Sequence, residues 1–186
     1  MPRQPHKDAE AQPAMRVRGG DASDAQACAA IYAPYVHETA ITFESVPPPS
    51  QEMGRRIAAA VETHAWLVLE HDERVVGYAY GGELNRRAAY RWSCEVSVYV
   101  ERGRRRTGAG RALYEALFER LTQRGFCMAV AGMTLPNEAS VGLHRALGFQ
   151  TVGVYRRIGY KQGAWHDVEW MQRPLGVASA PPPEPR

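Results

Sequence analysis

The stretch "RRRTGAGRALYEAL", residues 104–117, carries three arginines and a Gly-Ala-Gly turn directly before a run with helical hydrophobic spacing. Glycines let the main chain approach a ligand closely, and the start of a helix carries about half a positive charge. The stretch therefore predicts a helix that can bind an anion such as a pyrophosphate at its N-terminus. A loop that only turns the chain is the alternative, and this stretch alone does not decide between the two.

Three phosphate-binding patterns can be compared with these glycines. The P-loop pattern, GxxxxGK followed by Ser or Thr, is absent, and the dinucleotide pattern GxGxxG fails because Leu113 stands in place of its third glycine. A third pattern has Gln or Arg, then two residues, Gly, one residue, and Gly or Ala, between a strand and a long helix. It is matched in full by Arg105, Arg106, Thr107, Gly108, Ala109 and Gly110, and Arg111 adds a further positive charge.

The segments on either side of this stretch predict two strands. Residues 90–100 alternate, so that Cys94, Val96, Val98 and Val100 share one face and Glu95, Ser97 and Tyr99 share the other. Residues 126–133, "FCMAVAGM", form a short apolar run typical of a strand buried on both faces, which makes a parallel neighbour plausible. The helix between them ends near Gly125.

The remaining pattern indicates a mixed α/β domain with a mostly antiparallel sheet and helices on both of its faces. Pro34 is expected to bend or end the first helix, and the β-branched and aromatic residues of "TAITFES" predict an extended segment. The expected strands are residues 15–19, 65–70, 74–81, 149–157 and 165–173, and the expected helices are 24–38, 51–64 and a short one within 136–149.

Composition narrows the class of protein. The 186 residues favour one domain, and a net charge of +3 is weak for a protein dedicated to nucleic acid. Three scattered cysteines fit a reducing compartment, and neither a membrane-spanning run nor a signal sequence is visible, so we expect a cytoplasmic protein. We expect a disordered tail at 1–14, a folded domain at 15–175 and an unpacked, Pro-rich tail at 176–186.

Four motifs in order resemble the GCN5-related N-acetyltransferase (GNAT) superfamily, and within it the phosphinothricin acetyltransferase group, which includes enzymes that act on methionine sulfoximine and methionine sulfone. The motifs are "AYRWSCEVSVYV", "TAITFES", "LPNEASVGLHRALGF" and "GAWHDVEWMQRPL". The resemblance covers nearly all of residues 15–175. It implies a GNAT-type sheet in which two parallel strands splay apart and hold acetyl-CoA between them.

The resemblance also implies where acetyl-CoA would bind. The main chain of Val98, Tyr99 and Val100 would pair with the pantetheine arm, and the loop from Arg105 to Gly110, with Arg111, would hold the pyrophosphate. Asn137 and Ser140 match positions that contact the far end of the pantetheine. Simple capping of a helix by Asn137 is the alternative role for that side chain.

Two residues match catalytic positions of the group. Glu95 corresponds to the catalytic carboxylate, and burial would raise its pKa and make it a better base near neutral pH. His144 stands where most of the superfamily has tyrosine, and the phosphinothricin group shares this histidine. Histidine can donate or accept a proton, so the sequence leaves open whether His144 protonates the thiolate or helps to deprotonate the amine.

We expect the acceptor site to be formed by Phe43, Arg87, Tyr90 and Trp92. Arg87 can bind a carboxylate or a tetrahedral anion through two hydrogen bonds, whereas ordinary core packing is the alternative role of Phe43 and Trp92. The adjacent His166 and Asp167 point to opposite faces of a strand, so we expect no metal site. The resemblance further implies a homodimer that the C-terminal hairpin supports.

Three functions remain open from the sequence. The first is acetylation of a small amine that resembles an amino acid, and the second is acetylation of a protein N-terminus or lysine, which requires an open groove for the peptide. The third is a non-enzymatic module that binds acetyl-CoA. The presence of both Glu95 and His144 argues against the third function.

Overall fold

The computed structural model of the protein describes residues 15–104, 107–176 and 182–186. Within them the strands are β1 (Arg16–Gly19), β2 (Ala65–His71), β3 (Arg74–Glu83), β4 (Ser93–Val100), β5 (Met128–Thr134), β6 (Gln150–Lys161) and β7 (Ala164–Pro174). The helices are α1 (Ala25–Glu38), α2 (Ser50–Thr63), α3 (Ala109–Gln123) and α4 (Glu138–Ala146), with the short 3-10 helices η1 (Ala22–Asp24) and η2 (Ala88–Tyr90).

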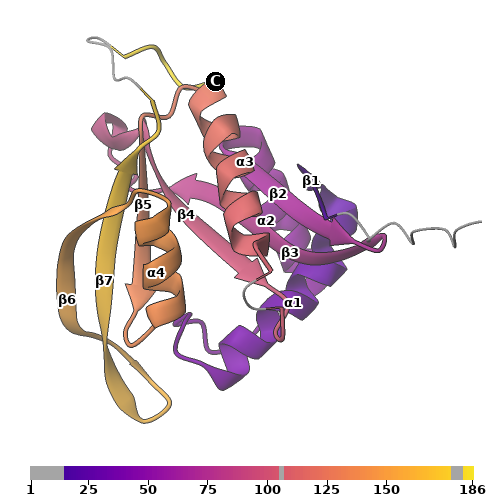
Figure 1. The fold of residues 1–186 in the computed structure, drawn as a ribbon, viewed down its shortest axis with the longest axis vertical. Helices are drawn as coiled ribbons and strands as arrows, with labels where there is room; N and C mark the ends of the chain where they lie inside the picture. The colour runs from indigo at the N-terminus through magenta and orange to yellow at the C-terminus, as the bar shows by residue number, and fades with distance from the viewer. Residues whose placement is uncertain (1–14, 105–106, 177–181) are drawn as a thin grey trace, which may run out of the picture.

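The strands form one seven-stranded sheet in the order β1-β2-β3-β4-β5-β7-β6 (Figure 1). Neighbouring strands are antiparallel except for β4 and β5, which are parallel. The helix α3 crosses between these two parallel strands, as a parallel connection requires. The mixed, mostly antiparallel sheet that the sequence predicts is thereby confirmed.

Each face of the sheet carries its own hydrophobic core, because the side chains of a strand alternate between the two faces. The helices α3 and α4 cover one face, where Leu113, Leu117 and Leu121 of α3 pack on the apolar side of β2, β3 and β4. The helices α1 and α2 cover the other face, where Ile57 packs with the aromatic residues of β2 and β3. Helices on both faces were expected from the sequence.

The structure confirms one local expectation and contradicts another. The helix expected at 24–38 is present as α1, and it does not end at Pro34, because Val36 beyond it is 1% exposed in the core and holds the last turn in place. The segment "TAITFES" contains no strand and forms a bent loop, residues 39–49, between α1 and α2. Its polar groups bond to helix residues and to β6 rather than to a neighbouring strand.

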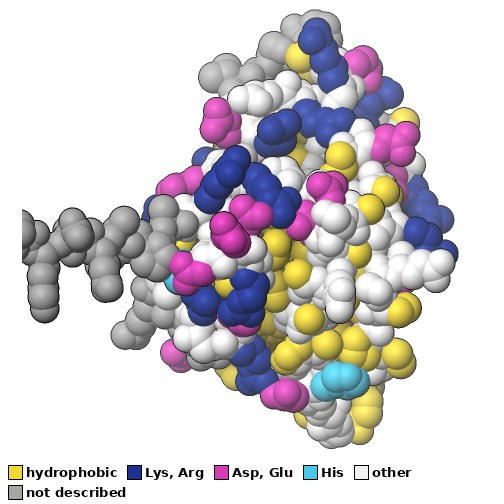
Figure 2. All heavy atoms as spheres, turned by 90° about the vertical axis from the view of Figure 1, so that its right-hand side faces the viewer, with side chains coloured by type: hydrophobic (Ala, Val, Ile, Leu, Met, Phe, Trp, Pro, Cys, Tyr) yellow, Lys and Arg dark blue, Asp and Glu magenta, His cyan; other side chains and the backbone are white. Residues whose placement is uncertain are grey.

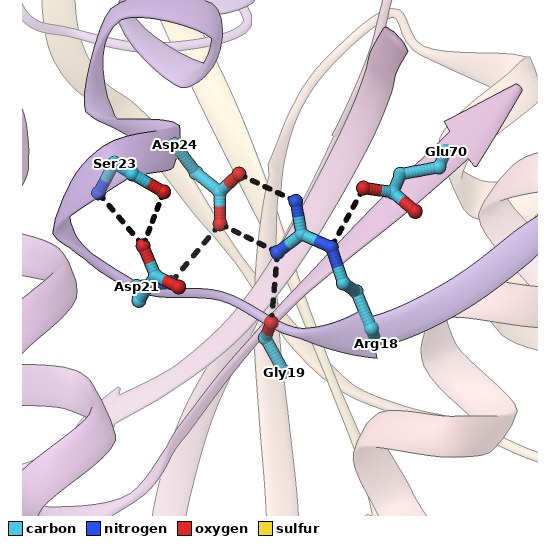
Figure 3. A network of polar contacts seen from close by, with 6 residues as sticks. All are labelled: Arg18, Gly19, Asp21, Ser23, Asp24 and Glu70. Atoms are coloured by element: carbon cyan, nitrogen blue, oxygen red, sulfur yellow. Dashed lines mark hydrogen bonds and ion pairs between the residues drawn. The ribbon is translucent and has the colours of Figure 1, made fainter. Parts of the chain in front are cut away.

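A network of ion pairs fixes the edge strand β1 to the rest of the domain (Figure 3). The guanidinium of Arg18 donates to both carboxylate oxygens of Asp24 at 2.8 Å, and its Nε donates to Glu70 at 2.7 Å. Asp21 begins η1 by accepting a hydrogen bond from the main-chain N–H of Ser23. The network ties β1 to β2 and to the start of α1, and its carboxylates raise the pKa of Arg18.

Charged side chains of both signs are interspersed on the side of the molecule nearest β1 (Figure 2). Hydrophobic side chains gather in the lower middle of the same face. A surface that binds nucleic acid is usually dominated by positive charge, and this face does not have that character. In the described part of the chain, none of the helices has the length and apolar content to cross a membrane.

The C-terminal residues 182–186 lie against the domain, although the sequence suggested an unpacked tail. The indole N–H of Trp92 donates to the carbonyl of Pro183 at 2.7 Å, and the main chain of Arg186 pairs with that of Arg124. Arg124 also donates to carbonyls at the end of α2. These partners lie far away in the sequence, so the composition of the tail could not reveal them. The expected tail at 1–14 lies outside the described residues.

Candidate active site

The parallel strands β4 and β5 separate soon after they begin to pair. Their pairing covers Ser93 to Glu95 on β4 and Met128 to Val130 on β5, whereas β4 continues to Val100. On its other side, β5 is paired with β7 along its whole length. One edge of β4 therefore faces a gap in the middle of the sheet.

The antiparallel pairing of β3 and β4 determines which main-chain groups face this gap. The N–H of Glu101 donates to the carbonyl of Val76 at 2.8 Å. Alternate residues of an antiparallel strand direct their N–H and C=O groups to opposite sides, so Tyr99 directs its groups to β3. By the same alternation Val98 and Val100 direct theirs into the gap. An added strand would therefore pair with Val98 and Val100 and not with Tyr99. Of the three residues that the resemblance implied for pantetheine pairing, two remain.

The carbonyl of Val100 already accepts a hydrogen bond from the hydroxyl of Tyr35, at 2.5 Å. This contact joins the end of β4 to α1 and leaves Val98 as the principal main-chain group in the gap. A small cavity, here called the wedge cavity, occupies the gap. It brings together the predicted residues Val98, Tyr99, Asn137, Ser140 and His144.

His144 is 2% exposed, and both of its ring nitrogens have partners. Its Nδ1 lies 2.8 Å from the main-chain carbonyl oxygen of Ser140, which can only accept, so Nδ1 carries the hydrogen. Its Nε2 lies 3.1 Å from the hydroxyl oxygen of Tyr114 and accepts a hydrogen bond from it. Burial lowers the pKa of His144 and raises that of Tyr114, so the imidazole is neutral and the phenol keeps its proton.

Asn137 and Ser140 lie at the start of α4, beside this histidine. The side-chain oxygen of Asn137 accepts a hydrogen bond from the main-chain N–H of Ser140 at 3.2 Å, which is the capping role considered from the sequence. The hydroxyl of Ser140 lies 3.4 Å from Nδ1 of His144. Asn137 therefore caps α4 and also lines the wedge cavity.

The start of α3 has the geometry that an anion requires. Gly108 has a φ of +81°, which favours glycine, and no described atom lies within 4 Å of the place where a side chain would begin. Gly110 lies so close to Leu143 of α4 that an added methyl group would be 3.1 Å from it. The first N–H groups of α3, beginning at the buried Ala109, have no partners within the helix.

Two side chains around this helix start already have partners within the protein. The hydroxyl of Thr107 donates to the carbonyl of Arg104 at 3.0 Å, and Arg111 pairs with Glu115 at 3.1 Å on the exposed side of α3. The two predicted arginines, Arg105 and Arg106, lie outside the described residues.

Glu95 extends from β4 on the face that α1 and α2 cover. Its side chain has no hydrogen bond or ion pair with any residue that the structure describes, and burial raises its pKa. It lies at the last paired position before β4 and β5 separate, opposite Gly82 of β3 and Val130 of β5. A carboxylate with few polar partners beside an opening in the sheet is well placed to accept a proton.

Glu95 also lies between two cavities along the same face of β4. Ser97, two residues further on, lines the wedge cavity. Ser93, two residues earlier, lines a cavity of about 430 Å³ that contains Arg87 and Tyr90. A third cavity of about 320 Å³ adjoins the second one and is lined by Gly82, the neighbour of Glu95 on β3. Glu95 therefore lies on β4 between a residue that lines the wedge cavity and a residue that lines the cavity of about 430 Å³.

The four residues suggested for the acceptor occupy different places. Arg87 and Tyr90 line the cavity of about 430 Å³, at either end of η2. Trp92 precedes β4 rather than belonging to it, and it contacts Pro183. Phe43 is 42% exposed and lies against β6. None of the four lines the wedge cavity.

The structure adds three residues that sequence patterns did not indicate. Ile41 and Gly132 line the wedge cavity on the Glu95 face, and Tyr114 lines it beside His144. Gly132 allows the indole of Trp170 to lie against β5, since an added methyl group would be 3.1 Å from the ring. Tyr114 follows the helical period of α3 and is indistinguishable from a core residue in the sequence. Only the contact with α4 reveals it.

These features fit acetyl-CoA, the cosubstrate that the resemblance implied. The exposed edge of β4 at Val98 suits a pantetheine arm that pairs like an added strand. The N-terminus of α3 with an open Gly108 suits a pyrophosphate. In the described part of the chain, no group of three or more His, Cys, Asp or Glu side chains could hold a metal ion.

Comparison with known proteins agrees with the geometry. The family model "Acetyltransferase (GNAT) domain" matches residues 18–170. A phosphinothricin N-acetyltransferase of Streptomyces viridochromogenes is 36% identical over 169 residues, 91% of this chain and 92% of that protein. An L-methionine sulfoximine/L-methionine sulfone acetyltransferase of Salmonella typhimurium is 32% identical over 168 residues, 90% of this chain and 98% of that protein.

A solved structure shows the same fold. The phosphinothricin acetyltransferase from Sinorhizobium meliloti, in complex with acetyl-CoA, superposes with a TM-score of 0.86 and 34% identity, and covers 92% of this chain and 93% of its own. The family model spans most of the chain, and both curated relatives exceed 30% identity over almost their whole length. The chain therefore belongs to the GNAT family of acetyltransferases, whose acetyl donor is acetyl-CoA.

Proposed function

We propose that this acetyltransferase acetylates the α-amine of a small acceptor that resembles an amino acid, of the phosphinothricin, methionine sulfoximine or methionine sulfone type. The observation that carries the proposal is the position of Glu95, a half-buried carboxylate on β4 between Ser97, which lines the wedge cavity, and Ser93, which lines the arginine-lined cavity. The names of the curated relatives support the same acceptor class.

Glu95 acts as the general base, directly or through water. The amine must lose a proton before its nitrogen can attack the thioester carbonyl, and a carboxylate whose pKa is raised by burial is better matched to this task near neutral pH. The new amide bond forms as the carbon–sulfur bond breaks. The sulfur leaves as a thiolate, which then takes up a proton, so the reaction is balanced without a redox partner.

The cosubstrate is held by main-chain groups of β4 and α3, and Arg105, Arg106 and Arg111 add charge-assisted hydrogen bonds to the pyrophosphate. The main chain of Val98 pairs with the pantetheine arm, and the N-terminus of α3 at Gly108 and Ala109 binds the pyrophosphate. Asn137 and Ser140 contact the far end of the pantetheine. This assignment uses groups whose directions are fixed by the sheet and by the helix, so little freedom is lost on binding.

His144 contributes as a proton acceptor in its resting state. Its Nε2 carries a lone pair that faces the hydroxyl of Tyr114, and a neutral imidazole of this tautomer has no hydrogen to give at that atom. A proton therefore has to arrive at Nε2 before His144 can pass one to the thiolate. The hydroxyl of Tyr114 orients the ring by its hydrogen bond to Nε2, and its raised pKa means that the proton for the thiolate comes from another group.

Arg87 and Tyr90 bind the anionic groups of the acceptor. Their cavity also contains Arg86 and Arg91, and a cluster of guanidinium groups suits a carboxylate together with a phosphinate or sulfone. The same cavity reaches Ser93, two residues from Glu95 on one face of β4. An acceptor anchored there by its acid groups can direct its amine towards Glu95.

A small acceptor is favoured over a peptide because two elements meet beside the wedge cavity, next to Ile41. The closed end of the β6–β7 hairpin and the loop after α1 lie at the same end of the fold (Figure 1). Lys161 donates to the carbonyl of Thr42 at 2.7 Å, and Phe43 lies against Gly159. A peptide would need an open groove where these contacts lie.

The experiment compares acceptors at saturating acetyl-CoA by the release of free thiol. We expect the largest kcat/KM among phosphinothricin, methionine sulfoximine and methionine sulfone, with little turnover of a panel of peptides that present free N-termini and lysines. Preference for a peptide would replace the proposal with protein acetylation. Binding of acetyl-CoA without turnover of any amine would leave only the non-enzymatic module.

Two further proposals concern the assembly and the compartment. Strand β6 forms the edge of the sheet and exposes several large hydrophobic side chains, so a second copy of the chain is proposed to cover it in a homodimer. These are Val152, Tyr155, Ile158 and Tyr160, with Trp165 on β7. All three cysteines are unpaired, which supports a reducing compartment such as the cytoplasm.

A further inference from the structure

The loop between α1 and α2, residues 39–49, reaches the wedge cavity on the sheet face that carries Glu95. Ile41 lines that cavity together with Ser97 and Gly132, all on the sheet face that carries Glu95. Ile41 is 37% exposed, so packing against its own helices does not hold it in place. Something outside the loop must determine how closely this side chain covers the cavity.

A single ammonium group from the C-terminal hairpin supplies that constraint. The Nζ of Lys161, the last residue of β6, donates to the carbonyl of Val36 and to that of Thr42, each at 2.7 Å. The carbonyl of Val36 belongs to the last turn of α1, where no further helix residue can bond to it. A positive charge is favoured at that end of a helix.

Lys161 therefore joins two points on either side of the bend that carries Ile41. The carbonyl of Thr42 immediately follows Ile41, and the neighbouring carboxylate of Glu44 adds attraction to the ammonium group. Partial burial lowers the pKa of Lys161, and Glu44 counteracts this effect. Lys161 lies 119 residues from Thr42 in the sequence, so this contact joins distant parts of the same chain.

The other hydrogen bonds of the loop come from α1, from α2 and from the loop itself. The hydroxyls of Tyr32 and Thr42 lie 2.6 Å apart, and Glu44 forms a two-point ion pair with Arg56. These bonds hold the side chains of the loop to α1 and α2. Within the loop, the N–H of Ile41 donates to the hydroxyl of Thr39 at 3.2 Å, and that of Glu44 donates to the hydroxyl of Thr42 at 3.3 Å. Lys161 adds a contact from a distant strand to the carbonyl of Thr42.

A glycine on the same strand completes the contact. A methyl group added at Gly159 would lie 2.2 Å from ring atoms of Phe43, so the ring occupies the space that any other residue would fill. The ring of His166 on β7 lies 6.2 Å from the ring of Phe43. The β6–β7 hairpin thus contacts the loop at two adjacent places: Lys161 bonds to the carbonyl of Thr42, and Gly159 packs against the ring of Phe43.

We propose that Lys161 is a positioning residue for the acceptor site, which holds residues 39–49 so that Ile41 closes the wedge cavity on its acceptor side. The proposal rests on the proposed function, because it assigns this side of the cavity to the amine acceptor. Lys161 itself takes no part in the proton transfers.

The test is Lys161→Met, which keeps the length of the side chain and removes the donor. Hydrogen bonds from a charged group are worth enough that we expect the acceptor KM to rise by about 10-fold or more. The KM of acetyl-CoA should stay within about 2-fold, because the cosubstrate is bound by β4 and α3. Lys161→Arg should restore much of the acceptor KM, since a guanidinium can reach both carbonyls.

Arg156→Gln is the matched control, because it removes a charge from the same hairpin at a side chain that is 79% exposed and pairs only with Asp167. Gly159→Ala is the second variant, and it should raise the acceptor KM by displacing Phe43 if Lys161→Met does not fold. Unchanged KM values in folded Lys161→Met, or equal losses for both substrates with a lower Tm, would overturn the positioning role.

The measurement uses whichever amine the wild-type enzyme acetylates best, so the two proposals fail separately. A wild-type preference for peptides would refute the small acceptor, whereas the split between the two KM values would still report on Lys161.

Discussion

The Nε2 atom of His144 lies 3.1 Å from the hydroxyl oxygen of Tyr114. This hydrogen bond joins α4 to α3 beside the wedge cavity. The Nδ1 hydrogen is already committed to the carbonyl of Ser140. The pair is therefore arranged with the phenol as donor and the imidazole as acceptor. A helical histidine that could have been a simple core residue is thus oriented towards a proton-carrying group.

Replacing Tyr114 with Phe tests this pair. The ring packing is retained, and we expect the loss of about 1 kcal/mol of stability that one hydrogen bond contributes. If Tyr114 orients His144 for proton transfer, kcat should fall by about 10-fold while both KM values stay within about 2-fold. Removing a donor to Nε2 should also raise the pKa of His144, which NMR of the imidazole can follow.

Tyr78→Phe is the control for that measurement. Tyr78 is 1% exposed and lies on the opposite face of the sheet, where its ring stacks on Trp66. Equal kinetic effects of the two variants would assign Tyr114 to packing alone.

Replacing Glu95 with Gln should remove the base and keep the shape. At pH 7 we expect a loss in kcat/KM of about 10²–10⁴-fold, with binding of acetyl-CoA retained. In the wild type, kcat/KM should fall as the pH falls through the raised pKa, because the base becomes protonated. The deficit of the variant should shrink at high pH, where more of the acceptor amine is already deprotonated. A folded variant with near wild-type turnover at pH 7 would remove Glu95 from the mechanism.

The same variant makes a prediction about stability. Burial raises the pKa of Glu95 in the folded state above its value in the unfolded chain. The stability that this shift contributes is fully present below the unfolded pKa and is lost as the pH rises through the folded pKa. At pH 7 the buried carboxylate is therefore a cost that glutamine avoids. We expect the Tm of Glu95→Gln at pH 7 to equal or exceed that of the wild type, and a lower Tm would indicate a structural role.

Gly108→Val should raise the KM of acetyl-CoA by about 10-fold or more, because a branched side chain would stand where the pyrophosphate approaches the helix. The acceptor KM should change little. Gly103→Val provides a matched control, since Gly103 has a φ of +92° and equally open surroundings among the described atoms. Both variants carry the same backbone strain of about 1–2 kcal/mol. Equal KM values for acetyl-CoA in the two variants would refute the pyrophosphate assignment.

The homodimer predicts a mass of twice 20.7 kDa by light scattering at micromolar protein. Val152 and Ile158 are 61% and 56% exposed on the edge strand β6, so placing Asp at both positions should produce a monomer. Val61→Asp, at an exposed position on α2, should leave the mass unchanged. A wild-type monomer would exclude the homodimer.

Much of the fold follows from local pattern. The alternation of residues 93–100 on β4 predicts both the buried face and the separate position of Glu95, because neighbouring side chains of a strand must point to opposite sides. The apolar run that includes β5 predicts a strand buried on both faces with a parallel neighbour. The parallel neighbour is present, but only the face of Ala129, Ala131 and Met133 is fully buried, and Gly132 on the other face is exposed. The glycines at the start of α3 predict a main chain open to an anion, and the positive φ of Gly108 agrees.

Local pattern is less reliable where a distant partner supplies the energy. Pro34 removes one hydrogen bond from α1, but the packing of Val36 in the core maintains the helix beyond it. The β-branched residues of "TAITFES" favour an extended chain, yet no strand edge is available to them, and Lys161 takes the carbonyl of Thr42 instead.

The sequence by itself determined the order of the elements, the hydrophobic faces and the residue types at the cosubstrate loop, since each depends on periodicity or on the freedom of glycine within a few residues. Only the tertiary structure decided that Tyr114 faces His144, that Val98 and not Tyr99 directs its main chain into the gap, and that Lys161 holds the bend at Ile41. These relationships join residues from different elements. Their geometry is set by how the sheet separates and how the helices pack on it, which no local pattern encodes.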